Sequence, residues 1–194
     1  MSSIVIYPDS RLRKLCRIVT QEEIVNGTFY PLIDHLVQQL DESGGVGIAA
    51  SQVGELVRIL LARDTSAQIA KRGPKQQALL ERTPFDLLVM YNPVITYRSQ
   101  KTVFWIEGCL SIPGKVGVVE RAWEITVEYT DMKGDRITKT LSGYPARIIQ
   151  HEIDHHEGIL YIDRMIWHSI MRIEEYEANW QYCSPDELSL AFAA

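Results

Sequence analysis

The 194-residue sequence predicts a single α+β domain, in which short antiparallel β-sheets pack around a central helix and another helix follows at the C-terminus. Three observations predict this class. Several stretches alternate apolar and polar residues, as half-buried strands do. Other stretches place apolar residues at helical spacing. No repeat, low-complexity tract or linker divides the chain, so we expect one domain over 1–194.

The first half of the chain predicts a helix, then a strand, then an exposed excursion. Apolar residues at helical spacing cover 31–43, with Pro31 suited to the first turn and Gly44 to the end. A short apolar run at 57–62 predicts a strand. Residues 63–84 are polar and contain a Gly-Pro pair, which favours an exposed segment with one short helix.

The second half predicts strands and then helices. We expect strands at 87–92 and 94–98, on either side of a proline. Residues 123–131 and 136–141 alternate strongly and enclose a Lys-Gly pair, which predicts a hairpin.

Two helices complete the prediction. Residues 145–156 begin with a proline and place isoleucines and two histidines on one inward face, so this is the expected central helix. A last helix is expected over 169–182, with glutamates on its outer face. We expect residues from about 167 onward to form a helical extension of the domain.

The composition is that of a soluble globular protein, with 46% hydrophobic and 23% charged residues. A net charge of −5 argues against general binding to DNA or to an anionic membrane. No apolar run approaches the roughly 18 residues that a membrane span needs. The three widely spaced cysteines do not suggest a disulfide framework, and the N-terminus lacks the features of a targeting peptide. We therefore expect a reducing, cytoplasmic location of the bacterial type.

The stretch HEIDH at 151–155 carries the clearest chemical signal. In a helix, His151 and His155 lie one above the other on the same face, where two neutral imidazoles can bind one metal ion. The carboxylate of Glu152 between them can move the protons of a metal-activated water. The motif therefore predicts a metal-bearing helix and hydrolytic chemistry, but it supplies two ligands where a catalytic metal usually has three.

Three kinds of third ligand are compatible with such a helix. A histidine six residues after the second one is ruled out, because that position is Tyr161. An acidic residue from a following helix is compatible with the spacing of Glu174, Glu175 and Glu177. The thiolate of Cys109 is the third candidate, although a free cysteine is commonly a small buried apolar residue. The residues alone leave the last two open.

Three segments together resemble the signature motifs of the peptide deformylase family. They are GVGIAASQVG at 45–54, EGCLSIPG at 107–114 and QHEIDHHEG at 150–158, and they occur in the family's order and spacing. The segments 7–19 and 159–165 extend the resemblance to most of residues 4–166. One such motif is weak evidence, whereas three in order are highly specific.

The resemblance implies a catalytic apparatus and a reaction. It implies that Cys109, His151 and His155 bind the metal, which displaces the glutamates as ligands. It also implies that water activated by the metal attacks the formyl carbon of N-terminal formyl-methionine on newly made proteins, releasing formate. Glu152 would then serve as general acid and base. The side-chain amide of Gln52 and the backbone N–H of Leu110 would stabilise the oxyanion.

The resemblance also implies cofactor, substrate and partners. One divalent metal ion is expected; a thiolate with two imidazoles suits Zn(II), Co(II), Ni(II) or Fe(II), and the family typically uses Fe(II). The substrate would be the N-formyl-methionyl end of a nascent peptide, with transient ribosome contact as a further expectation. The expected substrate-binding residues are Val46, Gly47, Ile48, Gly108, Trp105, Tyr144, the hydrocarbon part of Arg147, and Ile148.

Several alternatives compete with this interpretation. The stretch GVGIAA also fits a nucleotide-binding fingerprint, but that motif needs a preceding strand and a following helix, the reverse of the predicted order. His156 stands where the family usually has leucine, and we expect it at the surface or beside the ligands, not as a ligand. A family relative with altered acyl or N-terminal preference is one alternative, and a ribosome-binding module with a vestigial site is another.

Overall fold

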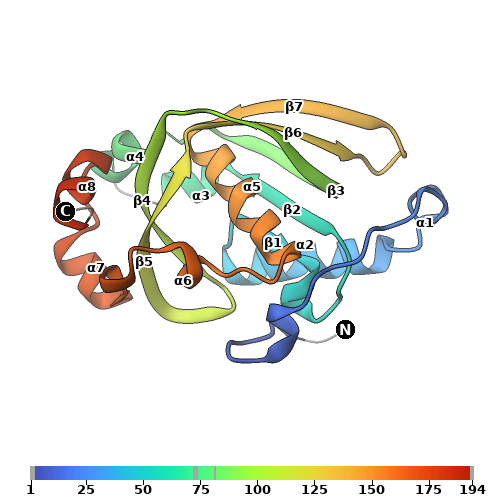
Figure 1. Cartoon of the computed structure of the whole chain (residues 1–194), viewed down its shortest axis with the longest axis horizontal. Coiled ribbons are helices and arrows are strands. Elements are labelled where there is room, and N and C mark those ends of the chain that lie inside the picture. Colours follow the sequence, from blue (N-terminus) through green and yellow to red (C-terminus); the bar gives the residue numbers. More distant parts are fainter. Residues whose placement is uncertain (1–2, 72–73, 81, 193–194) are drawn as a thin grey trace.

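The computed structural model describes residues 3–71, 74–80 and 82–192, and it has the predicted α+β architecture (Figure 1). Two antiparallel sheets enclose one long helix, α5, which occupies the middle of the molecule in Figure 1. Shorter helices lie around the outside, and the last two, α7 and α8, form one end of the molecule. No helix within the described ranges has the length and apolar character needed to cross a membrane.

The larger sheet has five strands in the order β1-β2-β3-β6-β7, all antiparallel. Strand β1 therefore lies at an edge of this sheet. The bounds are β1 Gly47–Ala49, β2 Ile59–Asp64, β3 Phe85–Arg98, β6 Glu124–Thr130 and β7 Arg136–Ser142.

The smaller sheet has the order β4-β5-β8 and is also antiparallel. Its bounds are β4 Thr102–Cys109, β5 Ile112–Ala122 and β8 Met171–Arg172. The short strand β8 joins the C-terminal part of the chain to this sheet, because Lys115 and Val116 of β5 pair with Arg172 and Met171.

The helices differ greatly in length, and only α2 and α5 are long. The α-helices are α1 Gln21–Val25, α2 Tyr30–Ser43, α3 Ser66–Ala70, α4 Pro74–Leu80, α5 Gly143–His156, α6 Tyr161–Arg164, α7 Ile173–Asn179 and α8 Pro185–Phe192. Three short 3₁₀ helices are η1 Ser10–Arg13, η2 Ala50–Val53 and η3 Trp167–Ser169.

Helix α5 is held in place by apolar side chains on one flank and by polar ones on the other. Ala146, Ile148 and Ile149 join a core cluster with Leu60, Ile125 and other residues of the five-stranded sheet. Burying side chains of this size contributes about 1.5–3 kcal/mol each, so the larger sheet fixes the rotation of α5 about its axis. The histidines are thereby directed toward β1 and the smaller sheet.

Most predicted elements are confirmed with small shifts of their ends. The helix expected over 31–43 is α2, the central helix expected over 145–156 is α5, and the hairpin expected at 123–141 is β6 and β7. The two strands expected around Pro93 form one long strand, β3, whose pairing shifts register where Asn92 has a φ of 52°. That irregularity lets the proline remain within a sheet.

Other parts of the prediction were wrong or incomplete. The helix expected over 169–182 begins only at Ile173, because the residues before it form η3 and β8, and a second helix, α8, follows. The excursion at 63–84 holds two helices, not one, and residues 72–73 and 81 of it lie outside the described part. The hairpin of β4 and β5 was not predicted, and strand β1 is short because two glycines precede it closely.

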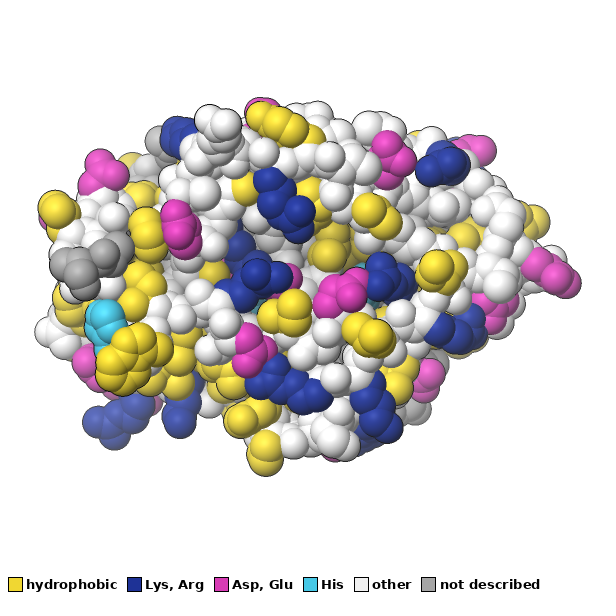
Figure 2. Space-filling view, in the orientation of Figure 1, with side chains coloured by type: hydrophobic (Ala, Val, Ile, Leu, Met, Phe, Trp, Pro, Cys, Tyr) yellow, Lys and Arg dark blue, Asp and Glu magenta, His cyan; other side chains and the backbone are white. Residues whose placement is uncertain are grey.

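Apolar side chains gather at the end of the molecule formed by α7 and α8 (Figure 2). Trp167 is 82% exposed and Leu190 is 81% exposed at this end. Beneath them, Trp180, Phe192 and the buried Leu188 pack against Trp105 of β4. The C-terminal helices are thus attached to the smaller sheet through an apolar cluster of their own.

Candidate metal centre

Two of the expected metal ligands lie on consecutive turns of α5. Their imidazole rings are 5.1 Å apart, centre to centre, as expected for residues at i and i+4 on one helical face. His155 is fully buried and His151 is nearly so. A third ring, that of Tyr161, stacks on His151 at 6.4 Å and limits the rotation of its imidazole.

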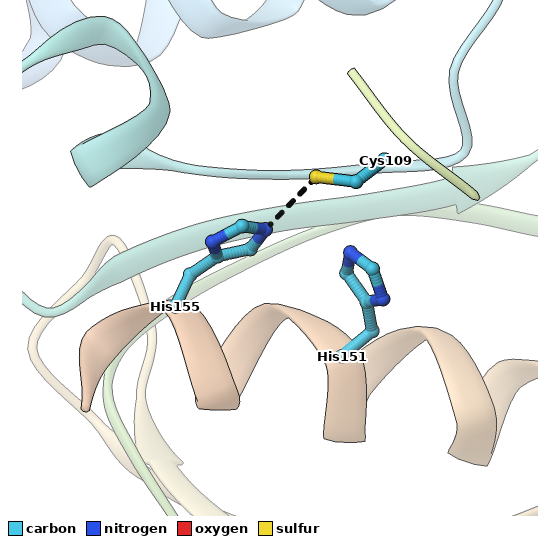
Figure 3. A group of neighbouring side chains, drawn as sticks. All are labelled: Cys109, His151 and His155. Carbon is cyan, nitrogen blue, oxygen red and sulfur yellow. Dashed lines mark hydrogen bonds between the residues drawn. The ribbon is translucent and has the colours of Figure 1, made fainter. Parts of the chain in front are cut away.

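The third donor comes from the last residue of β4. The register of β4 and β5 shifts between Gly108 and Cys109, and this irregularity turns the thiol toward α5. Its Sγ lies 3.3 Å from Nε2 of His155 (Figure 3). The donor atoms of Cys109, His151 and His155 all lie within 4.8 Å of one another, and this is the group of potential ligands found within the described ranges. Helix α7, with its exposed glutamates, contributes none of them.

The donor set fits a single divalent metal ion. One soft thiolate and two imidazoles in a partly buried site are the ligands that Zn(II), Fe(II), Co(II) and Ni(II) accept. Burial and neighbouring cations hold the pKa of His155 well below its usual value, so this imidazole is neutral, as a ligand must be. Nδ1 of His151 faces a carboxylate, which leaves its Nε2 for the metal side.

A buried carboxylate, that of Glu107, orients His151. Nδ1 of the imidazole lies 3.0 Å from Oε2 of Glu107, and Arg121 and Arg147 donate hydrogen bonds to the same carboxylate. Burial alone would raise the pKa of Glu107, but Arg121, the hydrogen bond with His151 and Arg147 lower it well below its usual value. The carboxylate is therefore ionised and holds the imidazole in a single orientation.

The ion pairs extend from this carboxylate to the outside of the helix. Arg121 also donates to Asp154 of α5, and Arg164 of α6 binds Asp154 from the other side. We call these five residues, Glu107, Arg121, Arg147, Asp154 and Arg164, the charge network. It contains three cations and two carboxylates, and its buried pairs are costly to break because an unpaired charge would remain. Asp154 thus accepts hydrogen bonds from Arg121 and Arg164.

Glu152 lies in the cleft wall beside the ligands and is only 4% exposed. Its Oε2 has no hydrogen-bond partner, and the carboxylate lies close to the backbone of β1: a Cβ placed on Gly47 would be 2.5 Å from Oε1. Burial raises the pKa of Glu152 to about 7. A carboxylate with a pKa near neutrality can both accept and return a proton, as a general acid and base does.

Gln52 is positioned by its own backbone. It belongs to η2, and its Oε1 accepts a hydrogen bond of 2.9 Å from the N–H of Ala49. This fixes the amide so that Nε2 points toward Sγ of Cys109 and Oγ of Ser111, each 3.4 Å away. The amide donor thus lies beside the potential metal ligands, in a residue that is only 1% exposed.

A cleft of about 540 Å³ opens onto these groups. Most of the predicted site residues line it, and they come from three parts of the sequence. They are Val46, Gly47, Gln52, Gly108, Cys109, Leu110, Tyr144, Arg147, Ile148, His151 and Glu152.

Two expected substrate-binding residues lie elsewhere. The side chain of Ile48 is fully buried in the core beneath β1, and Ile48 is not among the residues that line the cleft. Trp105 lines a neighbouring cavity of about 420 Å³, which we call the second cavity. Its lining residues are Ala78, Leu79, Lys101, Val103, Trp105, Ala122, Trp123, Gly143, Tyr144, Arg147, Pro185 and Asp186.

Arg147 lines the cleft as expected, and His156 differs from expectation. The guanidinium of Arg147 is buried, and it donates to Glu107 and to backbone carbonyls of both β4 and β5. His156 is neither at the surface nor beside the ligands. It is fully buried on another side of α5, where its Nε2 lies 3.1 Å from the carbonyl oxygen of Ile59. Five positions after His151, a side chain has rotated away from the ligand face.

Several residues of the site were not singled out from the sequence, among them Glu107, Lys115 and Ile173. Glu107 could have been found, since a carboxylate within the apolar strand before Gly-Cys needs a buried partner. Lys115 and Ile173 also line the cleft. Nothing in the sequence indicates Ile173, because it reaches the cleft only through the pairing of β8 with β5.

Comparison with protein families gives a match over most of the chain. The model of a family described as polypeptide deformylase matches residues 1–169. Peptide deformylase 1A, chloroplastic/mitochondrial, from Arabidopsis thaliana is 41% identical over 167 residues, which are 86% of this chain and 62% of that protein. Peptide deformylase from Aquifex aeolicus is 35% identical over 175 residues, which are 90% of this chain and 94% of that protein.

Solved structures give the same result. A class I type b peptide deformylase from Acinetobacter baumannii with bound Met-Ala-Ser has a TM-score of 0.75 and 31% identity, covering 85% of this chain and 98% of that one. Peptide deformylase from Thermotoga maritima has a TM-score of 0.71 and 30% identity, covering 85% and 97%. The chain spans 62% and 64% of the length of two plant relatives, from Arabidopsis thaliana and Solanum lycopersicum.

Proposed function

The chain belongs to the polypeptide deformylase family, and from this premise we propose that it hydrolyses the formyl amide of N-terminal formyl-methionine on newly made proteins, releasing formate. The single observation that carries the proposal is the position of Glu152. This buried carboxylate lies in one cleft with the Cys-His-His group and the amide of Gln52. The amide donor, the carboxylate base and the potential metal ligands thus surround the same part of the cleft.

Proton transfer falls to Glu152. A divalent cation held by Cys109, His151 and His155 would supply a Lewis acid and lower the pKa of a coordinated water. Glu152, with a pKa of about 7, takes up the proton that is released and returns it to the departing amine. Its unpartnered Oε2 is the oxygen available for that proton.

Charge that develops on the formyl oxygen is stabilised by fixed donors. The amide Nε2 of Gln52 is held beside the ligands by the bond between its Oε1 and the backbone of Ala49. The backbone N–H of Leu110, directly after Cys109, is the second proposed donor. Donors of this kind need no reorganisation during the reaction, and removing one typically costs 10²–10³-fold in kcat.

The peptide is proposed to bind as an added strand. Strand β1 lies at the edge of its sheet, and its first residue, Gly47, lines the cleft. An extended peptide can pair with such an edge through its backbone, without regard to its sequence. Val46, Tyr144 and Ile148 supply apolar surface for the methionine of the substrate. The unbranched methionine side chain is flexible and adapts readily to such a surface.

We assign Fe(II) as the working metal, with Zn(II), Ni(II) and Co(II) as substitutes that the donor set also accepts. An Fe(II) enzyme should lose activity in air, through oxidation of the iron or of the Cys109 thiolate, and keep it under nitrogen. Indifference to oxygen would exclude this assignment. We place the enzyme where translation begins with formyl-methionine, in a bacterial-type cytoplasm, with transient access to nascent chains at the ribosome.

The test is formate release from formyl-Met-Ala-Ser under nitrogen. Protein stripped of metal and reloaded with Fe(II) should release formate, and stripped protein should not. Glu152→Ala should bind metal and lower kcat by roughly 10²–10⁴-fold. Normal turnover by that variant would contradict the proton role of Glu152.

The same assay separates two alternatives. Release of acetate from an acetylated peptide at a comparable rate would indicate a relative with altered acyl preference. Ribosome binding without any formate release would indicate a binding module with a vestigial site. The second alternative has little support, because the described residues keep every group that the chemistry needs.

A further inference from the structure

The edge of the metal cleft formed by Lys115, Arg172 and Ile173, which we call the lip, carries two cations in an unfavourable arrangement. Lys115 of β5 and Arg172 of β8 are directly opposite each other in the antiparallel pairing. The next pair, Val116 and Met171, is buried, so Lys115 and Arg172 point outward and both are exposed. Like charges directly opposite each other destabilise a sheet.

Neither cation is neutralised within the protein. Over residues 3–71, 74–80 and 82–192, no ion pair involves Lys115 or Arg172, although glutamates follow Arg172 directly in α7. The chain as a whole has a net charge of −5, so acidic partners are not scarce. A local arrangement that costs stability without compensation commonly marks a functional surface.

The lip is continuous with the catalytic cleft. Lys115 lines the cleft together with Gly47, His151 and Glu152, and Ile173, the residue after Arg172, lines it too. A peptide whose formyl end lies between Gln52 and Glu152 must leave the cleft past one of its walls. The wall at β5 and β8 offers the side chains of Lys115 and Ile173, and Arg172 lies beside Lys115 at its rim.

We propose that Lys115 and Arg172 bind an acidic side chain of the formylated peptide, at the second or third residue, while Ile173 contacts its apolar part. This rests on the proposed function and names a preferred substrate class: formyl-Met peptides with Asp or Glu close behind the methionine. The strand β8 lies beyond residue 169, where the match to the family model ends. The preference therefore depends on this chain's C-terminal segment through Arg172 and Ile173, and on β5 through Lys115.

The experiment compares formyl-Met tripeptide amides that carry Glu, Gln or Lys at the second or third position. Amidation removes the terminal carboxylate, which would otherwise bind the same cations. At one of the two positions, kcat/KM should be roughly threefold to tenfold higher for Glu than for Gln, and lowest for Lys. The ratio should shrink as salt rises, because exposed charges are screened.

Charge variants of Lys115 and Arg172 test whether these two residues cause the preference for acidic peptides. K115Q/R172Q should bring the Glu-to-Gln ratio to about one, and K115E/R172E should favour the Lys peptide. The matched control is K139Q, at an exposed lysine of β7, which should keep the parent ratio. Equal rates for Glu and Gln in the parent, or an unchanged ratio in K115Q/R172Q, would overturn the proposal.

A binding measurement separates this proposal from the proposed function. Calorimetric affinities of the same peptides for the Glu152→Ala protein report the charge preference without turnover. If the protein discriminates peptides by charge but the parent releases no formate, the proposed function is contradicted and the role of Lys115 and Arg172 is supported. If the parent releases formate without discriminating peptides by charge, only the role of Lys115 and Arg172 is contradicted. A third outcome is that the parent binds polyuridylate, K115Q/R172Q does not, and neither protein prefers one peptide over another. Lys115 and Arg172 would then bind RNA phosphate and not an acidic peptide, which would overturn the proposal.

Discussion

The metal cleft and the second cavity are neighbours of similar size, and they share Tyr144 and Arg147 in their walls. Their construction differs. The cleft receives side chains that converge on one space: a thiol, two imidazoles, a carboxylate and an amide. In the second cavity the aromatic rings of Trp105, Trp123 and Tyr144 provide much of the wall, and Lys101 stacks on Trp123 at 4.3 Å without a carboxylate network behind it.

The difference teaches that volume does not identify a site. Behind the cleft, the charge network holds His151 in one orientation and keeps Glu107 ionised. The second cavity shares one residue of this network, Arg147, with the cleft, and its own cation Lys101 is exposed. Catalysis needs groups whose positions are fixed before the substrate arrives, and buried ion pairs provide that rigidity.

Removing a polar group that converges on the cleft should have the largest effect. Gln52→Ala is expected to lower kcat for formyl-Met-Ala-Ser by roughly 10²–10³-fold, because the developing negative charge loses a donor. Metal content, measured by atomic absorption, should stay at one ion per chain. An activity loss of less than about tenfold would show that the amide of Gln52 is not an oxyanion donor.

Breaking the charge network should damage stability and metal binding together. Glu107→Gln leaves Arg121 and Arg147 without their shared carboxylate, so we expect urea unfolding to show a loss of about 3 kcal/mol. Metal affinity should fall roughly 10–100-fold because His151 loses its orienting acceptor. The matched control is Glu128→Gln, whose partner Arg136 is highly exposed, and it should cost less than about 0.5 kcal/mol. Similar losses in both variants would contradict the role of the network.

Alanine substitutions at two glycines near β1 distinguish the effect of crowding in the cleft from the effect of backbone strain. Gly47→Ala would place a Cβ 2.5 Å from Oε1 of Glu152 and 2.7 Å from Cγ2 of Ile148, so the carboxylate must move. We expect kcat to fall roughly tenfold to a hundredfold. Gly44→Ala meets no atom within 4 Å but has a φ of 67°, so it should cost about 1 kcal/mol of stability and leave kcat unchanged. Unchanged kcat in Gly47→Ala would show that Glu152 tolerates displacement.

A change in the second cavity should affect stability more than activity. Trp123→Ala removes apolar wall and should lower the free energy of unfolding by about 2 kcal/mol. We expect kcat/KM for formyl-Met-Ala-Ser to change less than about threefold. A greater loss of kcat/KM would mean that the second cavity holds part of the peptide, and the contrast between the two cavities would then fail.

An exposed ion pair outside both cavities should give the smallest effect. Burial raises the pKa of Asp163, but hydrogen bonds from Arg13 and the backbone of Leu160 lower it further, so the net shift is downward. The pair's contribution is therefore present above the unfolded-state pKa and is lost as pH falls through the folded-state value. Both side chains are more than one-third exposed, so we expect Asp163→Asn to cost at most about 0.5 kcal/mol at pH 7. The difference from the parent should shrink in urea unfolding at pH 3, and a constant difference would exclude the ion pair as its source.

How much of the site was predictable depends on the sequence distance between its parts. Residues four apart in a helix are neighbours whatever surrounds them, so HEIDH at 151–155 was sufficient to place two ligands and Glu152 together. The hairpin of β6 and β7 was equally local. Cys109 was named as a ligand by resemblance to a family, since spacing alone left Glu174, Glu175 and Glu177 open.

The sequence by itself determined the metal-bearing helix, the antiparallel hairpin and the family to which the motifs belong. Only the tertiary structure decided which side chains face the cleft. Trp105 and Glu107 alternate with Ile106 on β4, and the register shift at Cys109 then turns the thiol toward α5. In a strand, one residue of register moves a side chain to the opposite face, so direction depends on pairing that a linear pattern does not specify. Ile173 reaches the cleft through such a pairing, formed between segments more than fifty residues apart.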